Sequence, residues 1–251
     1  MGPFLIGGLV LAVVAAVRGL WSPYGLSMIS TITPMSERGR GHRFWVTACW
    51  YTFGGVAGGA TLGAVIALGA WGVSASGADL GVRAALLAVA ALVTVASDTE
   101  VVGRSLPNHP RQVDETWLKR YRAWAYATGF GWQIGTGVAT YVMTSGVYLL
   151  MAVGVLSGDP ALAFGLGVAF GLVRGLAVFV SAGADRPERL RRLHATVDRW
   201  ARPSLVAAVA AQLVVLALAT VHVAGPVAVV IVVLAVVGAA RLAVAPRFAH
   251  S

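Results

Sequence analysis

Cysteine is nearly absent from this sequence, and charged side chains are scarce. The 251 residues include one cysteine, Cys49, which excludes an internal disulfide, a cysteine-based zinc site and a dithiol relay within the chain. Charged residues make up 12% of the sequence, whereas a typical soluble domain has about 25%. No long polar segment remains that could fold separately. These shortages indicate a single domain, residues 1–251, that is embedded in a membrane.

Apolar residues take the place of the missing charge. They make up 58% of the chain, the mean hydropathy is +0.79, and they occur in runs long enough for transmembrane helices, which need about 20 residues each. We predict an all-α polytopic membrane bundle of about seven transmembrane helices, with six to eight compatible with the pattern. The expected spans are residues 3–35 (broken), 45–73, 83–102, 123–153, 161–183, 204–222 and 225–244.

The first apolar run is too long for one plain span. Pro23 lies inside it and removes a backbone hydrogen bond, so we predict a break near Trp21 to Gly25. The freed backbone groups must then face protein or water instead of lipid. Residues 3–35 either cross once in this broken form or make a hairpin, which would give eight spans and an N-terminus inside the cell.

The net charge of +9 could suggest nucleic acid, but the placement of the charges indicates membrane topology. Basic side chains concentrate in alternate connections and in the tail: Arg38, Arg40, Arg43, Arg104, Arg111, Lys119, Arg120, Arg122, Arg186, Arg189, Arg191, Arg192, Arg199, Arg202, Arg241 and Arg247. The other connections hold only Arg83. The positive-inside rule predicts a plasma-membrane protein with its N-terminus outside, its C-terminus in the cytoplasm, and anionic lipid headgroups at its cytoplasmic face.

Two of the basic connections have helical amphipathic patterns. The apolar positions are Val113, Trp117, Tyr121 and Trp124 in one, and Leu190, Leu193, Val197 and Trp200 in the other. Arginines lie on the opposite faces. We expect two cytoplasmic interfacial helices, whose role is either to bind a partner or only to orient the protein.

Glycines form small-residue faces on two spans. The positions are Gly54, Gly55, Gly58, Gly59 and Gly63 on the second span, and Gly167, Gly171 and Gly175 on the fifth. Such faces let helices approach closely. They predict tight packing with another helix, which could belong to a second copy of the chain or to a partner membrane protein.

Arg18 and Arg174 lie within apolar runs, each in the sequence Val-Arg-Gly-Leu. A charge inside the membrane costs a few kcal/mol or more, so such residues are candidates for function. The alternative is that each side chain reaches the cytoplasmic headgroups. Asp98 and Glu100 are the candidate counter-charges, and the repeated tetrapeptide is either an internal repeat or chance.

The fourth span is the most polar. Gln133, Thr136, Thr140 and Thr144 are spaced by three and four residues and so share one helix face. This face could line a substrate path or hydrogen bond to neighbouring helices for about 0.6 kcal/mol each. Together with Arg18, Pro23, Tyr24 and Arg174, it forms the candidate substrate path. The histidines are scattered and no catalytic constellation is present, so we predict no metal, no cofactor and no catalytic residue.

Two short stretches carry a family resemblance. WSPYGLSMISTITP and GFGWQIGTGVATYV resemble parts of the CcdA/DsbD-type membrane thiol transporters and the related TauE/SafE-like exporters. Ser22, Pro23 and Pro34 match the family pattern in kind. The resemblance implies two related three-span halves around a central site. Tyr24 stands where the redox cysteine would be, so thiol relay is not available.

These features favour a small secondary transporter or exporter-like permease, with an anion as the candidate substrate. The alternative is a non-catalytic membrane scaffold or assembly subunit of a larger complex, which the tight glycine faces and the missing catalytic cluster support. An intramembrane enzyme that acts on a lipid is a third option. It would need a nucleophile or an acid pair that the sequence does not show.

Overall fold

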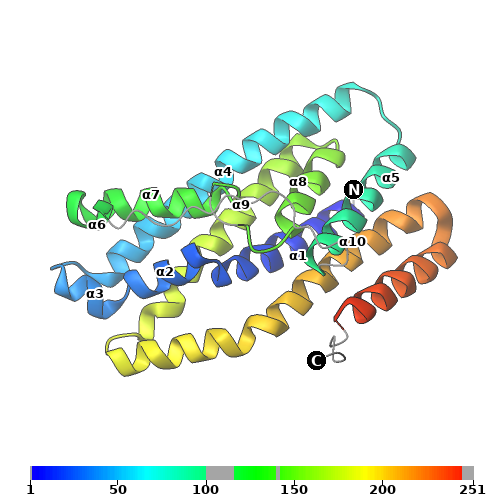
Figure 1. The fold of residues 1–251 in the computed structure, drawn as a ribbon. Helices are drawn as coiled ribbons and strands as arrows, with labels where there is room; N and C mark the ends of the chain where they lie inside the picture. The colour runs from blue at the N-terminus through cyan, green and yellow to red at the C-terminus, as the bar shows by residue number, and fades with distance from the viewer. Residues whose placement is uncertain (1, 100–115, 140–141, 245–251) are drawn as a thin grey trace, which may run out of the picture.

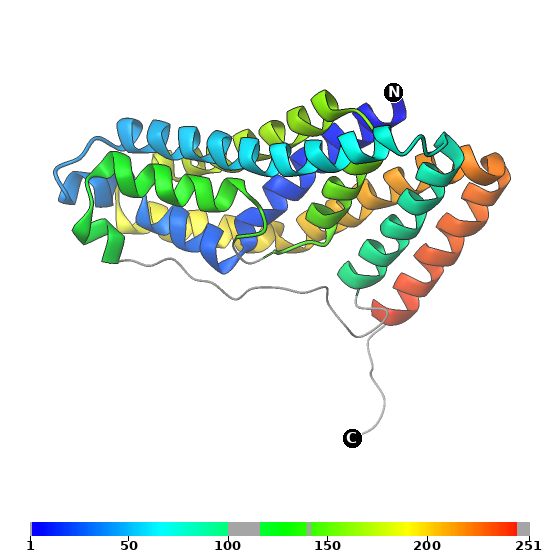
Figure 2. The same ribbon diagram turned by 90° about the horizontal axis from the view of Figure 1, so that it is seen from above.

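The protein is an elongated bundle of helices (Figures 1 and 2). The computed structural model describes residues 2–99, 116–139 and 142–244, with side chains at 4–99, 116–118, 120–139 and 142–224. Every regular element in these ranges is an α-helix or a short 3₁₀ helix. One end of the bundle, here called the basic end, is formed by α3, α6 and the beginning of α10 (Figure 1).

Five helical segments in the described ranges are long and apolar enough to cross a membrane. They are Phe4–Trp21, Phe44–Ala75, Leu80–Asp98, Pro160–Gly183 and Pro187–Ala224. A shorter apolar helix covers Gly146–Leu156. The prediction of an all-α membrane protein is confirmed at this level, but the structure does not reproduce the count of seven spans.

The first apolar run is a broken helix. α1 covers Gly2–Arg18, a 3₁₀ turn covers Gly19–Trp21, and α2 covers Pro23–Thr31. Ser22 is extended, and its hydroxyl accepts a hydrogen bond from the Gly25 amide at 2.9 Å. Proline is favoured at the first position of a helix because its missing N–H would be unpaired there anyway. α2 continues in the general direction of α1, so the run does not fold back into a hairpin (Figure 1).

α3 (Pro34–Gly39) leads into α4 (Phe44–Ala75), which packs along α7 and α9. The glycines of α4 lie directly against these two helices: a β-carbon on Gly59 would be 2.7 Å from Gly171 Cα, and one on Gly58 would be 2.9 Å from Thr136 N. The predicted close packing therefore occurs within the chain, so a contact with another protein requires a different surface.

The predicted fourth span is interrupted. α6 covers Thr116–Arg120, α7 covers Ala123–Gly135 and α8 begins only at Gly146, ending at Leu156. Gly137 has a φ of 71°, which a right-handed helix does not accept. The expected continuous helix over residues 123–153 was therefore wrong. In the described part of the first amphipathic segment, α6 ends at Arg120 and α7 begins at Ala123, so Trp117 and Trp124 are not on one continuous helix. Residues 111–115 lie outside the described ranges.

The last third of the chain contains α9 (Pro160–Leu176), a 3₁₀ segment η2 (Ala177–Gly183) and α10 (Pro187–Val244). α5 (Leu80–Asp98) packs against α10. The second amphipathic segment and the predicted spans 204–222 and 225–244 all belong to α10, so no separate interfacial helix exists there. Its ribbon bends and then turns back towards the C-terminus (Figure 1).

Candidate functional site

Arg174 lies where two helix ends meet. It is in the last turn of α9 and only 4% exposed. Its Nε donates a hydrogen bond to the carbonyl oxygen of Ile134, in the last turn of α7, at 3.2 Å. Its guanidinium packs directly against Gly19, just beyond the end of α1. The same group lies 5.8 Å from the centre of the Phe170 ring.

The ends of α1 and α7 provide negative potential for Arg174. A helix C-terminus carries roughly half a negative elementary charge because its last carbonyl groups are not paired within the helix. Among the described residues, no carboxylate forms an ion pair with Arg174. Two helix C-termini together supply about one negative charge. This arrangement stabilises a buried cation without an acidic side chain.

A small cavity adjoins this position. Arg174, Tyr51, Gly19 and Gly25 are among its lining residues, and its volume is ≈10 Å³. That volume is about what one water molecule needs. The closed packing around Arg174 leaves no room for a substrate of several atoms at this position.

Tyr24 and Gln133 connect the two broken helices. The Tyr24 hydroxyl donates to Gln133 Oε1 at 3.3 Å, and Pro23 begins the helix that carries Tyr24. Thr136 lies just after α7, and its hydroxyl donates to the Gln133 carbonyl at 2.8 Å. Thr140 lies outside the described residues. The predicted polar stripe does not form as one face because the helix ends at Gly135.

Thr144 belongs to a second polar centre, around Asp98. The Thr144 hydroxyl donates to the Asp98 carboxylate, the Ser145 amide donates to it at 2.7 Å, and Gln212 Nε2 also donates to it at 2.7 Å. α8 begins one residue later, at Gly146. A carboxylate is favourable at this end of a helix because the first N–H groups are unpaired. Asp98 therefore joins α5, α8 and α10.

Arg18 connects the end of α1 to α10. Its Nη1 donates to the Ala201 carbonyl at 2.8 Å and to the Ser204 hydroxyl at 2.7 Å, and the side chain is 8% exposed. Trp21 adds a bond from its indole nitrogen to the Val197 carbonyl at 2.8 Å. The structure therefore separates Arg18 from Arg174: one links α1 with α10, and the other lies between α1 and α7.

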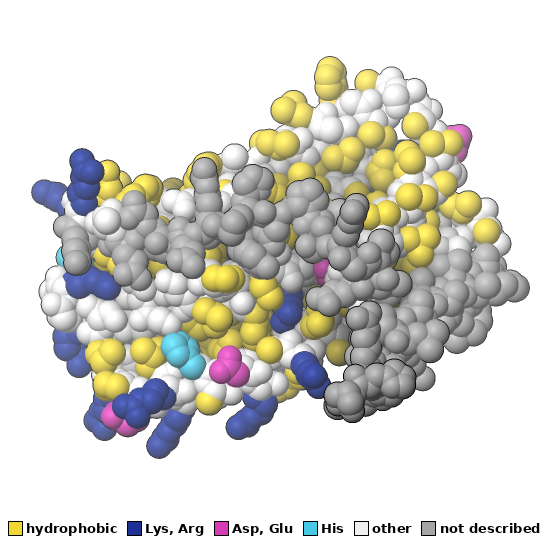
Figure 3. Space-filling view, viewed as in Figure 1, with side chains coloured by type: hydrophobic (Ala, Val, Ile, Leu, Met, Phe, Trp, Pro, Cys, Tyr) yellow, Lys and Arg dark blue, Asp and Glu magenta, His cyan; other side chains and the backbone are white. Residues whose placement is uncertain are grey.

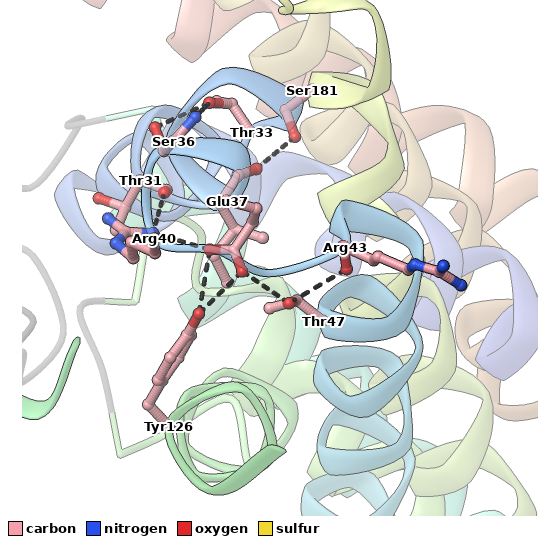
Figure 4. A network of polar contacts seen from close by, with 10 residues as sticks. Thr31, Thr33, Ser36, Glu37, Arg40, Arg43, Thr47, Tyr126 and Ser181 are labelled. Atoms are coloured by element: carbon pink, nitrogen blue, oxygen red, sulfur yellow. Dashed lines mark hydrogen bonds and ion pairs between the residues drawn. The ribbon is translucent and has the colours of Figure 1, made fainter. Parts of the chain in front are cut away.

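A third polar centre, around Glu37, was not predicted. Glu37 is fully buried and accepts hydrogen bonds from Arg40 at 2.7 Å, from Thr47 at 2.6 Å and from Tyr126 at 2.9 Å (Figure 4). These bonds join α3, α4 and α7. In the sequence Glu37 lies among exposed-looking arginines, and no periodic pattern marks it as buried. Its partner Tyr126 is 89 residues away, so local patterns could not reveal the cluster.

Each of these polar centres holds a charged residue between helices, and at Glu37 that residue also forms an ion pair with Arg40. Among the described residues, no three or more histidine, cysteine, aspartate or glutamate side chains are grouped so that they could hold a metal ion. Each centre links three helices, or a helix with two helix ends. Contacts of this kind fix the positions of helices relative to one another in an apolar bundle.

Comparison with known proteins shows what the chain is similar to. No protein-family model and no solved structure matches it. It is 32% identical over 181 residues to the methylamine utilization protein MauF of Paracoccus versutus, covering 69% of this chain and 65% of the relative. The proteins of the same name from Paracoccus denitrificans and Methylophilus methylotrophus are 31% and 27% identical over 176 and 199 residues. They cover 68% and 76% of this chain and 62% and 66% of the relatives, so this chain spans about two thirds of their length.

These similarities overturn two predictions. The resemblance to CcdA/DsbD-type and TauE/SafE-like transporters was wrong, because the proteins that align over most of the chain carry a different name. The interpretation as a permease was also wrong, because these relatives are named for methylamine utilization and not for transport. One feature behind it, the polar stripe, is also interrupted between α7 and α8. Over most of its length, the chain is similar to proteins of methylamine utilization.

Proposed function

We propose that this protein is a non-catalytic membrane scaffold or assembly subunit that serves methylamine utilization. The observation that carries the proposal is the similarity to three MauF proteins over 68–76% of the chain. The internal structure supports it. The buried Glu37 and Arg174 and the half-buried Asp98 join helices. The cavity next to Arg174 has room for about one water molecule.

The proposal includes a topology. We place the protein in the plasma membrane with its basic end in the cytoplasm, its N-terminus outside and its C-terminus inside. Lys and Arg side chains gather towards this end (Figure 3). Seven crossings, with residues 225–244 as the last, agree with this orientation. Anionic lipid headgroups surround the basic end, and the protein partner binds a surface other than the glycine faces.

Gene deletion tests the role in methylamine utilization. A strain of the source organism that lacks this gene is expected to lose growth on methylamine and to keep its growth on other carbon and nitrogen sources. The wild-type gene supplied in trans should restore growth. Unchanged growth of the deletion strain on methylamine would contradict the proposed role.

Native gel electrophoresis and mass determination of the protein in mild detergent test the scaffold role. An assembly subunit is expected to migrate with a second protein in fixed stoichiometry when cells grow on methylamine. A species that contains only this chain under all growth conditions argues against a scaffold.

A further inference from the structure

The beginning of α10 presents a cationic surface along the bundle. We define the α10 flank by its exposed arginines: Arg189, Arg191, Arg192, Arg199 and Arg202. Exposed Lys and Arg side chains lie along the lower left of the molecule in Figure 3, where Figure 1 draws the first turns of α10. Trp200, between two of these arginines, is 58% exposed. Arginine and tryptophan are the residues most often found at the energetic centre of protein interfaces.

The flank is held in place by its inner face. Val197 is 4% exposed, and its carbonyl accepts the bond from the Trp21 indole at 2.8 Å. His194 Nε2 lies 2.9 Å from the Ser30 hydroxyl of α2. The arginines therefore project from a segment that is already packed, so a partner would not have to order the backbone on binding.

Exposed apolar side chains lie at the same level as the flank along the long axis of the bundle. The Ser181 hydroxyl donates to the Ile32 carbonyl at 2.7 Å, and Ile32 is two residues beyond Ser30, which contacts the flank. Val180, next to Ser181, is 47% exposed, and Trp45, stacked on Phe179, is 63% exposed. If lipid covers these side chains, it also reaches the level of the flank.

Three acidic residues lie beside the arginines of the flank. Asp185 lies just before α10, and the exposed Glu188 and Asp198 lie four residues before Arg192 and Arg202. In the described residues, the ion pairs are Arg40 with Glu37 and Arg189 with Asp185. The sequence of residues 100–115 adds three acidic residues but also two arginines. The whole chain has 10 acidic against 19 basic residues. The flank, with five arginines beside three acidic residues, therefore keeps an excess of positive charge that an acidic partner can complement.

The length of the flank distinguishes a protein from lipid headgroups. Arg189 and Arg202 are 13 residues apart in sequence, which is about 20 Å along a helix. The polar headgroup layer on one side of a bilayer is only about 6 Å thick, so it cannot face both ends of the flank. An acidic helix that runs alongside α10 can, because residues three and four apart share one face.

We propose that the α10 flank binds an acidic amphipathic helix of a second membrane protein. This proposal rests on the proposed assembly function and names the chemistry of the partner. Carboxylates spaced by three or four residues on the partner helix pair with the arginines, and Trp200 packs against its apolar edge. Guanidinium groups pair with carboxylates through two parallel hydrogen bonds, which gives such contacts a defined geometry.

Photo-crosslinking in native membranes tests the proposal. A benzoylphenylalanine is placed at Thr196, which is exposed in the middle of the flank, and at Leu68 on α4, which is 70% exposed, as the control. We expect Thr196 to give one protein adduct whose cross-linked segment carries acidic residues at helical spacing, and Leu68 not to give it. The adduct should fall at least tenfold in the double variant Arg191→Glu, Arg192→Glu.

Exchanging the charges of the two partners provides the decisive experiment. Replacing two acidic residues of the cross-linked segment by lysine should restore the adduct with the double variant, which also shows that this variant is folded. The pair Arg38→Glu, Arg43→Glu makes the same charge change elsewhere at the basic end and should leave the adduct unchanged. An adduct with phospholipid alone, a cross-linked segment without acidic residues, no adduct, or no effect of the charge changes overturns the proposal.

Growth separates this proposal from the function on which it rests. If the deletion strain fails on methylamine but the double variant grows normally and keeps its adduct, the flank proposal fails while the assembly function stands. If the deletion strain grows normally but the charge exchange works, the flank stands and the methylamine role fails.

Discussion

The guanidinium of Arg174 fills the space beside Gly19 that a side chain on Gly19 would occupy. Gly19 opens the 3₁₀ turn after α1, while Arg174 comes from α9. The bond from Arg174 to Ile134 extends this contact to the end of α7. One buried cation therefore connects the interruptions of two apolar helices. Because the guanidinium of Arg174 fills this space, position 19 requires a residue without a β-carbon.

Gly19→Ala should destabilise the protein. The new methyl group overlaps Arg174 Nη1, so the guanidinium must move away from the ends of α1 and α7. Overpacking of this kind costs about 1–3 kcal/mol, and loss of the bond to Ile134 adds to it. We expect a lower melting temperature in detergent, measured by tryptophan fluorescence. An unchanged melting temperature would show that the guanidinium can move without cost.

The packing of α4 against α9 offers a matched pair of glycines. Gly59→Ala places a methyl group 2.7 Å from Gly171 Cα, whereas the β-carbon of Gly72→Ala has no atom within 4 Å. The first variant should lose about 1–3 kcal/mol, and the second should gain up to about 1 kcal/mol because alanine is the better helix former. Thermal unfolding of both variants checks this, and equal effects would contradict the packing seen here.

Removal of the buried carboxylate at Glu37 should be more damaging than removal of an exposed one. Glu37→Ala leaves Arg40, Thr47 and Tyr126 without their acceptor, and each hydrogen bond to a charged group contributes about 1.5–3 kcal/mol. The exposed Glu188 provides the control, since surface substitutions usually stay within about 0.5 kcal/mol. If the two variants melt at the same temperature, the Glu37 cluster does not stabilise the fold.

Substitution of Asp98 should loosen the start of α8. Asp98→Ala removes the acceptor of the Ser145 amide and of the Thr144 hydroxyl. Loss of a helix cap costs about 0.5–2 kcal/mol. Amide hydrogen exchange should rise at residues 145–148 and stay unchanged at the start of α9, where Asp159 caps the helix. Equal protection of α8 in both proteins would exclude this role.

The predicted break at Pro23 and the missed interruption after Gly135 show which helix breaks local sequence patterns reveal and which they do not. Proline removes a backbone donor wherever it stands, so its effect is visible in the sequence. α7 ends without a proline, in a stretch whose glycines and threonines also fit a continuous helix. The family resemblance failed for a related reason: short segments rich in glycine and proline recur in membrane helices, and the two segments covered little of the chain.

The sequence by itself determined that this protein is an all-α membrane protein with a basic end. Hydropathy and charge are properties of each local segment, so they can be read without knowing which segments contact one another. The tertiary structure decided which polar residues meet. Glu37 accepts a hydrogen bond from Tyr126, and Asp98 accepts one from Gln212. Arg174 packs against Gly19. Each contact joins helices that are distant in sequence. Burial of a charge costs much free energy unless such partners converge on it. That convergence depends on the arrangement of the whole bundle.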